Sequence, residues 1–258
     1  MEDYLKKHAT QAAYTTWAAS NDFVTPNVSL IDADGSLEYN AISIINPIPT
    51  TYVVTATFDI SYADSSVQIL GEDYNIQTSN ISKIEIDNVE LPSVVSTYNF
   101  STSGEHTVSY TLSDSTIGDH MFTSIGSNYT NDINITIPEG ITSIGEYAFS
   151  GTHLISIINI PNSVTTIGDD AFSDCQMSTC FIGTGITSIG NSAFYNNSWL
   201  SSLTINATTP PSLGDDNFSG EMSWPTIYVP AASVDTYKAD NSWSYFEDAI
   251  YAIGSNNE

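Results

Sequence analysis

The sequence predicts a mainly β protein, in which a small β-sandwich precedes a short repeat solenoid that ends in a C-terminal cap. Three observations support this fold class. An Ile-Gly or Leu-Gly pair with a phenylalanine five residues after its Ile or Leu occurs five times between residues 116 and 218, at periods of 27, 23, 22 and 24 residues. Short alternating segments separated by turn residues occupy residues 51–112. The pattern changes again after Val229, where a final apolar segment follows the repeats.

The five pairs that define the repeat are Ile117-Gly118, Ile144-Gly145, Ile167-Gly168, Ile189-Gly190 and Leu213-Gly214. Periods of roughly 20–29 residues are typical of leucine-rich-repeat solenoids. A single coil of such a solenoid cannot bury its apolar face alone, so each coil needs a neighbour. The predicted repeat core consists of Ile117, Phe122, Ile144, Phe149, Ile167, Phe172, Ile189, Phe194, Leu213 and Phe218.

One repeat, residues 143–165, shows the expected local structure. The Ile144-Gly145 pair predicts a tight corner, and Glu146 to Phe149 a short helical segment. Residues 154–160 alternate as a strand, and Pro161 ends it. Stacked strands of this kind would form one narrow parallel sheet. Its candidate exposed face consists of Ser156, Asn159, Thr179, Phe181, Ser202 and Thr204.

These repeats resemble a known family. The segments ITSIGEYAF (141–149), VTTIGDDAF (164–172) and ITSIGNSAF (186–194) are similar to the BspA-type leucine-rich repeats of Bacteroidales and their associated elements. The last unit, SLGDDNF (212–218), precedes residues 226–253, which resemble the closing segment of such proteins. The first repeat has four extra residues before Ile137, so we expect a looser entry coil or one that folds over the open end of the solenoid.

The chain divides into four predicted domains. Residues 1–48 are an N-terminal attachment or docking segment, with a helix over residues 1–24 and a hairpin after it. Their pattern resembles N-terminal segments of virion proteins from phages of gut Bacteroidales, which implies an attachment peptide; an ordinary N-terminal cap is the alternative. Residues 114–225 are the leucine-rich-repeat solenoid of five coils.

Residues 49–113 predict a β-sandwich, because short strands recur at roughly 8–12-residue spacing. Residues 100–112 resemble the closing hairpin of bacterial immunoglobulin-like domains, with the turn at Gly104. Residues 226–258 are the predicted cap, with a helix over residues 231–239. Its final apolar layer is predicted to contain Trp243, Tyr245, Phe246, Ile250 and Ile253.

Charge excludes one class of function. The chain has 4 Lys and Arg residues against 30 acids, for a net charge of −26. Such a surface repels phosphate and anionic lipid, so we expect neither nucleic-acid binding nor membrane insertion. No apolar run approaches the roughly 18 residues of a membrane-spanning helix. The first residues also lack the apolar core of a secretory signal.

Motifs for catalysis or cofactor binding were not found. The histidines, His8, His106, His120 and His153, are scattered and predict surface or turn positions. Cys175 and Cys180 lie in one repeat and predict two buried thiols rather than a disulfide or metal pair. The pairs Asp169-Asp170 and Asp215-Asp216 predict either carboxylates that cap the following turn or, less favoured, a calcium ladder.

The sequence therefore favours a non-enzymatic protein without a cofactor or metal. The first hypothesis is a phage virion structural, decoration or fibre protein, attached through residues 1–48, whose solenoid contacts a glycan or protein on a surface. The alternative is a BspA-like bacterial cell-surface adhesin for host matrix or other cells. A homo-oligomer remains open, and exposed Phe181 is a candidate contact residue.

Overall fold

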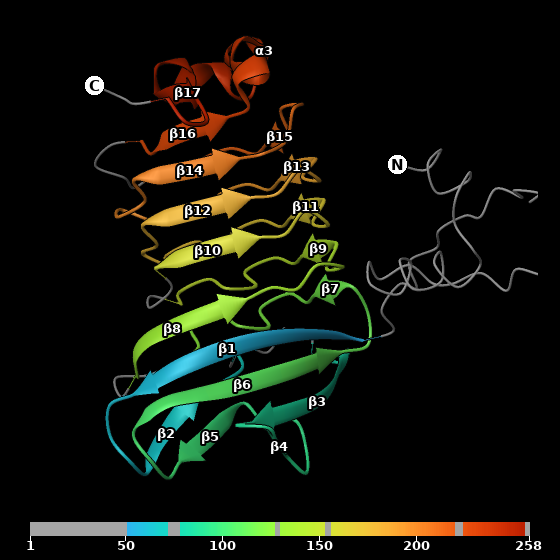
Figure 1. Cartoon of the computed structure of the whole chain (residues 1–258), viewed down its shortest axis with the longest axis vertical. Coiled ribbons are helices and arrows are strands. Elements are labelled where there is room, and N and C mark those ends of the chain that lie inside the picture. The colour runs from blue at the N-terminus through green and yellow to red at the C-terminus, as the bar shows by residue number, and fades with distance from the viewer. Residues whose placement is uncertain (1–50, 72–77, 127–129, 153–155, 220–223, 256–258) are drawn as a thin grey trace, which may run out of the picture. The chain divides into compact units, whose positions relative to one another are not determined.

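The computed structural model describes residues 51–71, 78–126, 130–152, 156–219 and 224–255. The predicted N-terminal helix and hairpin lie outside these residues. The chain divides between Pro49 and Thr50, and all of the architecture below belongs to the second unit, which begins at Thr50. Figure 1 shows its elements, with β1 to β6 in blue and green and the repeats in green through yellow to red.

The N-terminal part contains a five-stranded sheet of order β4-β3-β6-β1-β8 and a two-stranded sheet, β2-β5. Buried and partly exposed residues alternate along the longest strands, as expected when one face of a strand meets a core. The strands are β1 (Tyr52–Ile60), β2 (Ser65–Gln68), β3 (Ile81–Ile86), β4 (Val89–Glu90), β5 (Thr97–Phe100), β6 (Gly104–Leu112) and β8 (Thr130–Thr136).

The two sheets share one core. The rings of Phe58 on β1 and Phe100 on β5 lie 6.3 Å apart, and the buried Tyr110 hydroxyl on β6 donates to the Ile69 carbonyl at 2.6 Å. The predicted hairpin over residues 100–112 is wrong, because β5 pairs with β2 whereas β6 pairs with β1 and β3. The chain crosses from one sheet to the other around Gly104, and this keeps the apolar residues of both strands in the shared core.

Strand β8 connects the five-stranded sheet to the repeats. It lies in the sequence range predicted for the first coil, yet it pairs with β1 in antiparallel orientation and contacts β10 of the next coil. In Figure 1 it lies between these two strands. The entry coil thus covers the open end of the solenoid, and residue 113 does not mark a break in the core.

The repeats form two parallel sheets, where the sequence predicted one. The short-strand sheet consists of β7 (Thr116–Ile117), β9 (Ser143–Ile144), β11 (Thr166–Ile167), β13 (Ser188–Ile189) and β15 (Ser212–Leu213). The long-strand sheet consists of β10 (Ile157–Ile160), β12 (Thr179–Ile182), β14 (Ser202–Ile205), β16 (Thr226–Val229) and β17 (Ile250–Ala252). The Ile-Gly pair therefore starts on a strand, and only its glycine belongs to the corner.

A column of stacked phenylalanine rings runs along the buried core of the repeats. Successive rings of Phe122, Phe149, Phe172, Phe194 and Phe218 are separated by 5.2, 5.1, 5.8 and 6.2 Å and tilted by 17° or less. All five are buried, and Tyr110 on β6 packs edge-on against Phe122 at 4.9 Å. The N-terminal sheets and the repeats therefore share one continuous core.

The corner after each glycine is a chain of turns, so the predicted helical segment 146–149 is wrong. Tyr147 has a φ of 52°, which a right-handed helix does not allow. Some corner amides bond within their own turn, as Ser150 N–H does to the Tyr147 carbonyl, but others bond to the following coil. The Tyr147 N–H donates to the Asp169 carbonyl at 3.0 Å, and the Phe149 N–H donates to the Ala171 carbonyl at 2.8 Å.

The corner glycines are required by close approach between coils. Gly168 has no positive φ, in contrast to the explanation by tight-corner dihedrals. A Cβ at Gly168 would lie 2.7 Å from the Glu146 nitrogen of the preceding coil, and a Cβ at Gly190 would lie 2.6 Å from the Asp169 nitrogen. Any side chain here would separate the coils and weaken the ring stacking.

After β16 the chain forms η1 (Ala231–Ser233), α3 (Val234–Ala239) and η2 (Ser244–Ala249). The helix predicted over residues 231–239 is confirmed as η1 and α3 together. Trp243 is fully buried and donates from Nε1 to the Pro211 carbonyl at 2.7 Å. Ile250 is buried too, but Tyr245 and Ile253 are 73% and 44% exposed, so their assignment to the final apolar layer is wrong.

Replacing Phe172 by alanine should lower the free energy of unfolding by about 3–5 kcal/mol, because it opens a cavity in the ring column. Chemical denaturation measures this loss. The matched control is Phe181→Ala, which removes the same side chain from a 39% exposed position and should cost no more than about 1 kcal/mol. Equal losses for the two variants would show that the ring column is not the core.

Candidate functional site

The long-strand sheet presents one face to the core and one face outward. Its inward positions are in register across all five strands and are fully or almost fully buried: Ile158, Cys180, Leu203, Ile227 and Ile250. Because side chains alternate along a strand, the residues before and after these positions point away from the core. We call those residues the outward face.

The outward face consists of two rows that follow the strand register. One row contains Ile157, Thr179, Ser202 and Thr226, and the other contains Asn159, Phe181, Thr204, Tyr228 and Tyr251. Five of the six candidate face residues from the sequence belong to these rows. Ser156 does not, because it precedes β10 and its carbonyl accepts the Ser178 N–H at 2.8 Å.

Sequence reasoning missed four residues of the outward face: Ile157, Thr226, Tyr228 and Tyr251. Strict alternation around the buried Ile158 would have identified Ile157. The two tyrosines also follow a buried isoleucine, but they lie in the segment that was interpreted only as a cap. With Phe181, they give the second row three aromatic side chains, of which Phe181 and Tyr251 are 39% and 38% exposed.

Charged residues are absent from the outward face. All nine side chains of the two rows are neutral, although the chain carries a net charge of −26. The acidic side chains of the described repeats gather instead at the corners beside the short-strand sheet, among them Asp119, Glu146, Asp169 and Asp215. The neutral outward face, with its aromatic residues, is therefore separate from these acidic corners, which we call the acidic ridge.

The ridge carboxylates bond to neighbouring coils. Asp119 Oδ1 accepts the Glu146 N–H at 2.8 Å, and Asp169 Oδ1 accepts the Asn191 N–H at 2.7 Å. Asn191 Oδ1 in turn accepts the Asp215 N–H at 3.0 Å. The sequence predicted that these carboxylates accept backbone N–H groups of the turn that follows them. They do accept backbone N–H groups, but those groups belong to the next coil. Within the described residues, no group of three or more His, Cys, Asp or Glu side chains is placed to hold a metal.

Both cysteines are free and fully buried, and burial raises the pKa of both thiols. Cys180 fills an inward position of β12. Cys175 donates through Sγ to the Phe149 carbonyl at 3.1 Å, as Thr152 and Asn197 donate to the corresponding phenylalanine of the coil before them. Cys175 thus has a structural role that a threonine or an asparagine fills in other coils.

The described histidines do not form a catalytic group. His106 on β6 contacts Asp87 at 2.7 Å between Nδ1 and Oδ2, and His120 stacks on Tyr147 at 4.9 Å. The remaining two, His8 and His153, lie outside the described residues. Asp170 hydrogen-bonds to Tyr147 and raises the pKa of its phenol. In the part of the chain that the structure describes, no helix is long and apolar enough to cross a membrane.

Two stacked parallel sheets with an aromatic column define this part of the chain as a leucine-rich-repeat solenoid. Residues 115–242 match the family model described as BspA type leucine rich repeat region, in six copies. This stretch, about half of the chain, is therefore a BspA-type repeat region, as the motifs implied. Six copies exceed the five predicted coils, so at least one copy lacks the Ile-Gly or Leu-Gly pair with its phenylalanine five residues on. A comparison with curated proteins found no match for the chain.

Replacing Asn191 by aspartate should destabilise the ridge by about 1 kcal/mol at neutral pH. The new carboxylate would face Asp169 Oδ2, which now accepts from Asn191 Nδ2 at 3.1 Å. In the variant, repulsion between the two carboxylates would raise the folded-state pKa of the pair above the unfolded value of about 3.9. The loss of stability would therefore be present at neutral pH and would disappear as the pH falls through the raised pKa.

Urea denaturation of the native chain and the variant between pH 3 and pH 7 measures this effect. Asn191→Ala is the control, because it also loses the bond to Asp169 but adds no charge, and its deficit should change less with pH. A pH-independent deficit for the aspartate variant would refute the carboxylate contact.

Proposed function

We propose that this protein is a non-enzymatic interaction protein displayed on a surface, and that the outward face of its long-strand sheet binds a protein partner. The observation that carries this proposal is the composition of that face. The cores of protein interfaces are enriched in aromatic residues and depleted of charged ones. Nine neutral side chains with three aromatics, on a chain with a net charge of −26, match that composition.

The rigidity of the face also supports this function. Each strand of the long-strand sheet is hydrogen-bonded to its neighbours in register, and the buried column of phenylalanine rings holds the coils in place. Such a surface loses little conformational freedom on binding, so more of the contact energy contributes to affinity. The family match supports the same class of function, since repeat regions of this kind serve protein–protein interaction at surfaces.

For the setting, we propose a phage virion, as a structural, decoration or fibre protein. The resemblance of residues 1–48 to virion N-terminal segments supports this choice, and these residues would then attach the protein to other virion proteins. Residues 49–113 would be an immunoglobulin-like spacer, residues 114–225 the displayed solenoid, and residues 226–258 its cap.

The second setting is a bacterial cell surface, where the protein would act as a BspA-like adhesin for host matrix proteins or other cells. The BspA-type repeats favour it. Mass spectrometry of density-purified phage particles and of bacterial outer-membrane fractions distinguishes the two settings. A fixed ratio to the capsid protein would support the virion, and enrichment in the membrane fraction would support the adhesin.

Replacing Phe181 and Tyr251 together by serine should reduce binding of the fluorescently labelled protein to intact Bacteroidales cells at least tenfold. These two side chains are the most exposed aromatics of the outward face, and interface aromatics often dominate binding energy. Flow cytometry with increasing protein concentration gives the apparent affinity.

Tyr62→Ser is the matched control, because Tyr62 is a 67% exposed aromatic residue outside the repeats. It should bind as the unmodified chain does. Thermal melts of all variants establish that they are folded. Unchanged binding by the double variant would contradict the assignment of the outward face, and no binding by the unmodified chain would contradict a cell-contacting role.

A further inference from the structure

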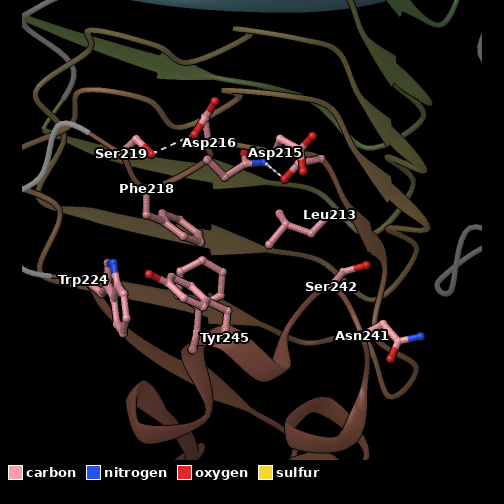
Figure 2. Close-up of a pocket in the computed structure, with 12 residues that line it drawn as sticks. Leu213, Asp215, Asp216, Phe218, Ser219, Trp224, Asn241, Ser242 and Tyr245 are labelled. Atoms are coloured by element: carbon pink, nitrogen blue, oxygen red, sulfur yellow. Dashed lines mark hydrogen bonds between the residues drawn. The ribbon is translucent and has the colours of Figure 1, made fainter.

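A cavity lies at the end of the solenoid, where the short-strand sheet stops. That sheet ends at β15, whereas the long-strand sheet continues through β16 and β17. The corner of the last coil is therefore left without a sixth corner stacked on it. The cavity lies between this corner and the segment that follows α3 and has a volume of about 620 Å³. Figure 2 shows the residues that line it. This volume is within the range of small-ligand pockets, roughly 300–1,000 Å³.

One wall of the cavity carries a side-chain acceptor of the kind that earlier coils use to bond to the next coil. Asp169 Oδ1 accepts the Asn191 N–H at 2.7 Å, and Asn191 Oδ1 accepts the Asp215 N–H at 3.0 Å. At the last corner this ladder ends. No described residue takes the place of a following coil at the Asp215 carboxylate, and Asp216 Oδ1 accepts only the Ser219 hydroxyl at 3.1 Å.

Asn217 is a second sign that this corner meets a ligand. It occupies the position that alanine fills in the three preceding coils, and it is only 2% exposed. Its Nδ2 donates to the Gly190 and Gly214 carbonyls, at 2.9 and 2.8 Å. Its Oδ1 is buried and has no hydrogen-bond partner among the described residues, although Asn217 lines the cavity. A buried acceptor without a partner is costly, so the last corner retains unmet hydrogen-bonding capacity beside the cavity.

The facing wall is aromatic. Trp224 and Tyr245 are 44% and 73% exposed, and Figure 2 shows them across the cavity from Asp215 and Asp216. The two rings lie 5.0 Å apart, and each packs edge-on against Phe246, at 5.3 and 5.4 Å. Because the rings contact one another, they cannot enclose a cation between them. They offer open faces on which a flat apolar surface can stack.

We propose that this cavity binds the end of a neutral glycan chain. A sugar ring combines an apolar C–H face, which stacks on an aromatic ring, with a rim of hydroxyl groups, which donate to carboxylate and amide oxygens. Asn241 and Ser242, which also line the cavity, supply further hydrogen-bonding groups. Its described lining contains no Lys or Arg, and the chain is strongly acidic, so an anionic sugar would be repelled.

This site shares no residue with the outward face and does not depend on the protein partner proposed above. The two bind by different chemistry, since the outward face has no carboxylate. A variant can therefore remove one function and leave the other. The Phe181 and Tyr251 double variant should retain glycan binding in full, which separates a failure of this inference from a failure of the proposed function.

The test is isothermal titration of the full chain with galactose, mannose, N-acetylglucosamine, N-acetylgalactosamine and disaccharides of these sugars. We expect saturable binding of at least one, with one site per chain. Tyr245→Ala and Asp215→Ala should each weaken it at least tenfold; Tyr245 is largely exposed, so its loss should leave the fold intact. Trp199→Ala is the control, because Trp199 is 69% exposed and does not line the cavity.

Two further probes distinguish other ligand chemistries. A sialylated trisaccharide should bind more weakly than its neutral parent, and choline chloride should not compete with the sugar. The proposal is overturned if no neutral sugar binds, if choline binds more tightly than every sugar, or if Trp199→Ala weakens binding as much as Tyr245→Ala does.

Discussion

The stacking of one coil on the next is the interaction on which the structure depends. The phenylalanine rings stack at separations of 5.1–6.2 Å, and several corner amides bond to the coil that follows. Glycine is required at the corner because the preceding backbone comes within 3 Å of the place of its Cβ. Ring stacking, backbone bonds and glycine therefore set the same spacing, and each fails without the others.

Both proposed sites follow from this spacing. Where coils stack, strands align in register, and the side chains of the outward face form rows that a rigid partner surface can contact. Where stacking ends, at the Leu213 to Phe218 corner, the groups that would have met another coil are left facing a cavity. Such unpaired groups occur at the ends of a solenoid, because in every inner coil the same groups hydrogen-bond to the neighbouring coil.

The repeat core was predictable because Ile, Gly and Phe recur at fixed positions, and each is a local signal. The second sheet was not predictable, since a strand of two residues such as Ser143–Ile144 has no alternation. The helix predicted for the corner was wrong because Tyr147 adopts a left-handed conformation. A bond to the next coil, about twenty residues away, holds it there, and no local pattern reveals that bond. The pairing of β8 with β1 was not predictable for the same reason, because the two strands lie far apart in the sequence. The exposure of Phe181 was predictable from the alternation along its strand. The cavity was not, because it brings together Asp215 and Tyr245, which no short sequence motif connects.

Native-state hydrogen exchange at the corner amides tests coil-to-coil bonding most directly. His120, Tyr147, Asp170 and Ser192 each donate their N–H to the following coil, at 2.8–3.0 Å, whereas Asp216 begins the corner without a following coil. The account predicts slow exchange at the first four amides, with protection approaching that of global unfolding, and fast exchange at Asp216. Fast exchange at Tyr147 and Asp170, or equal protection at Asp216, would contradict it.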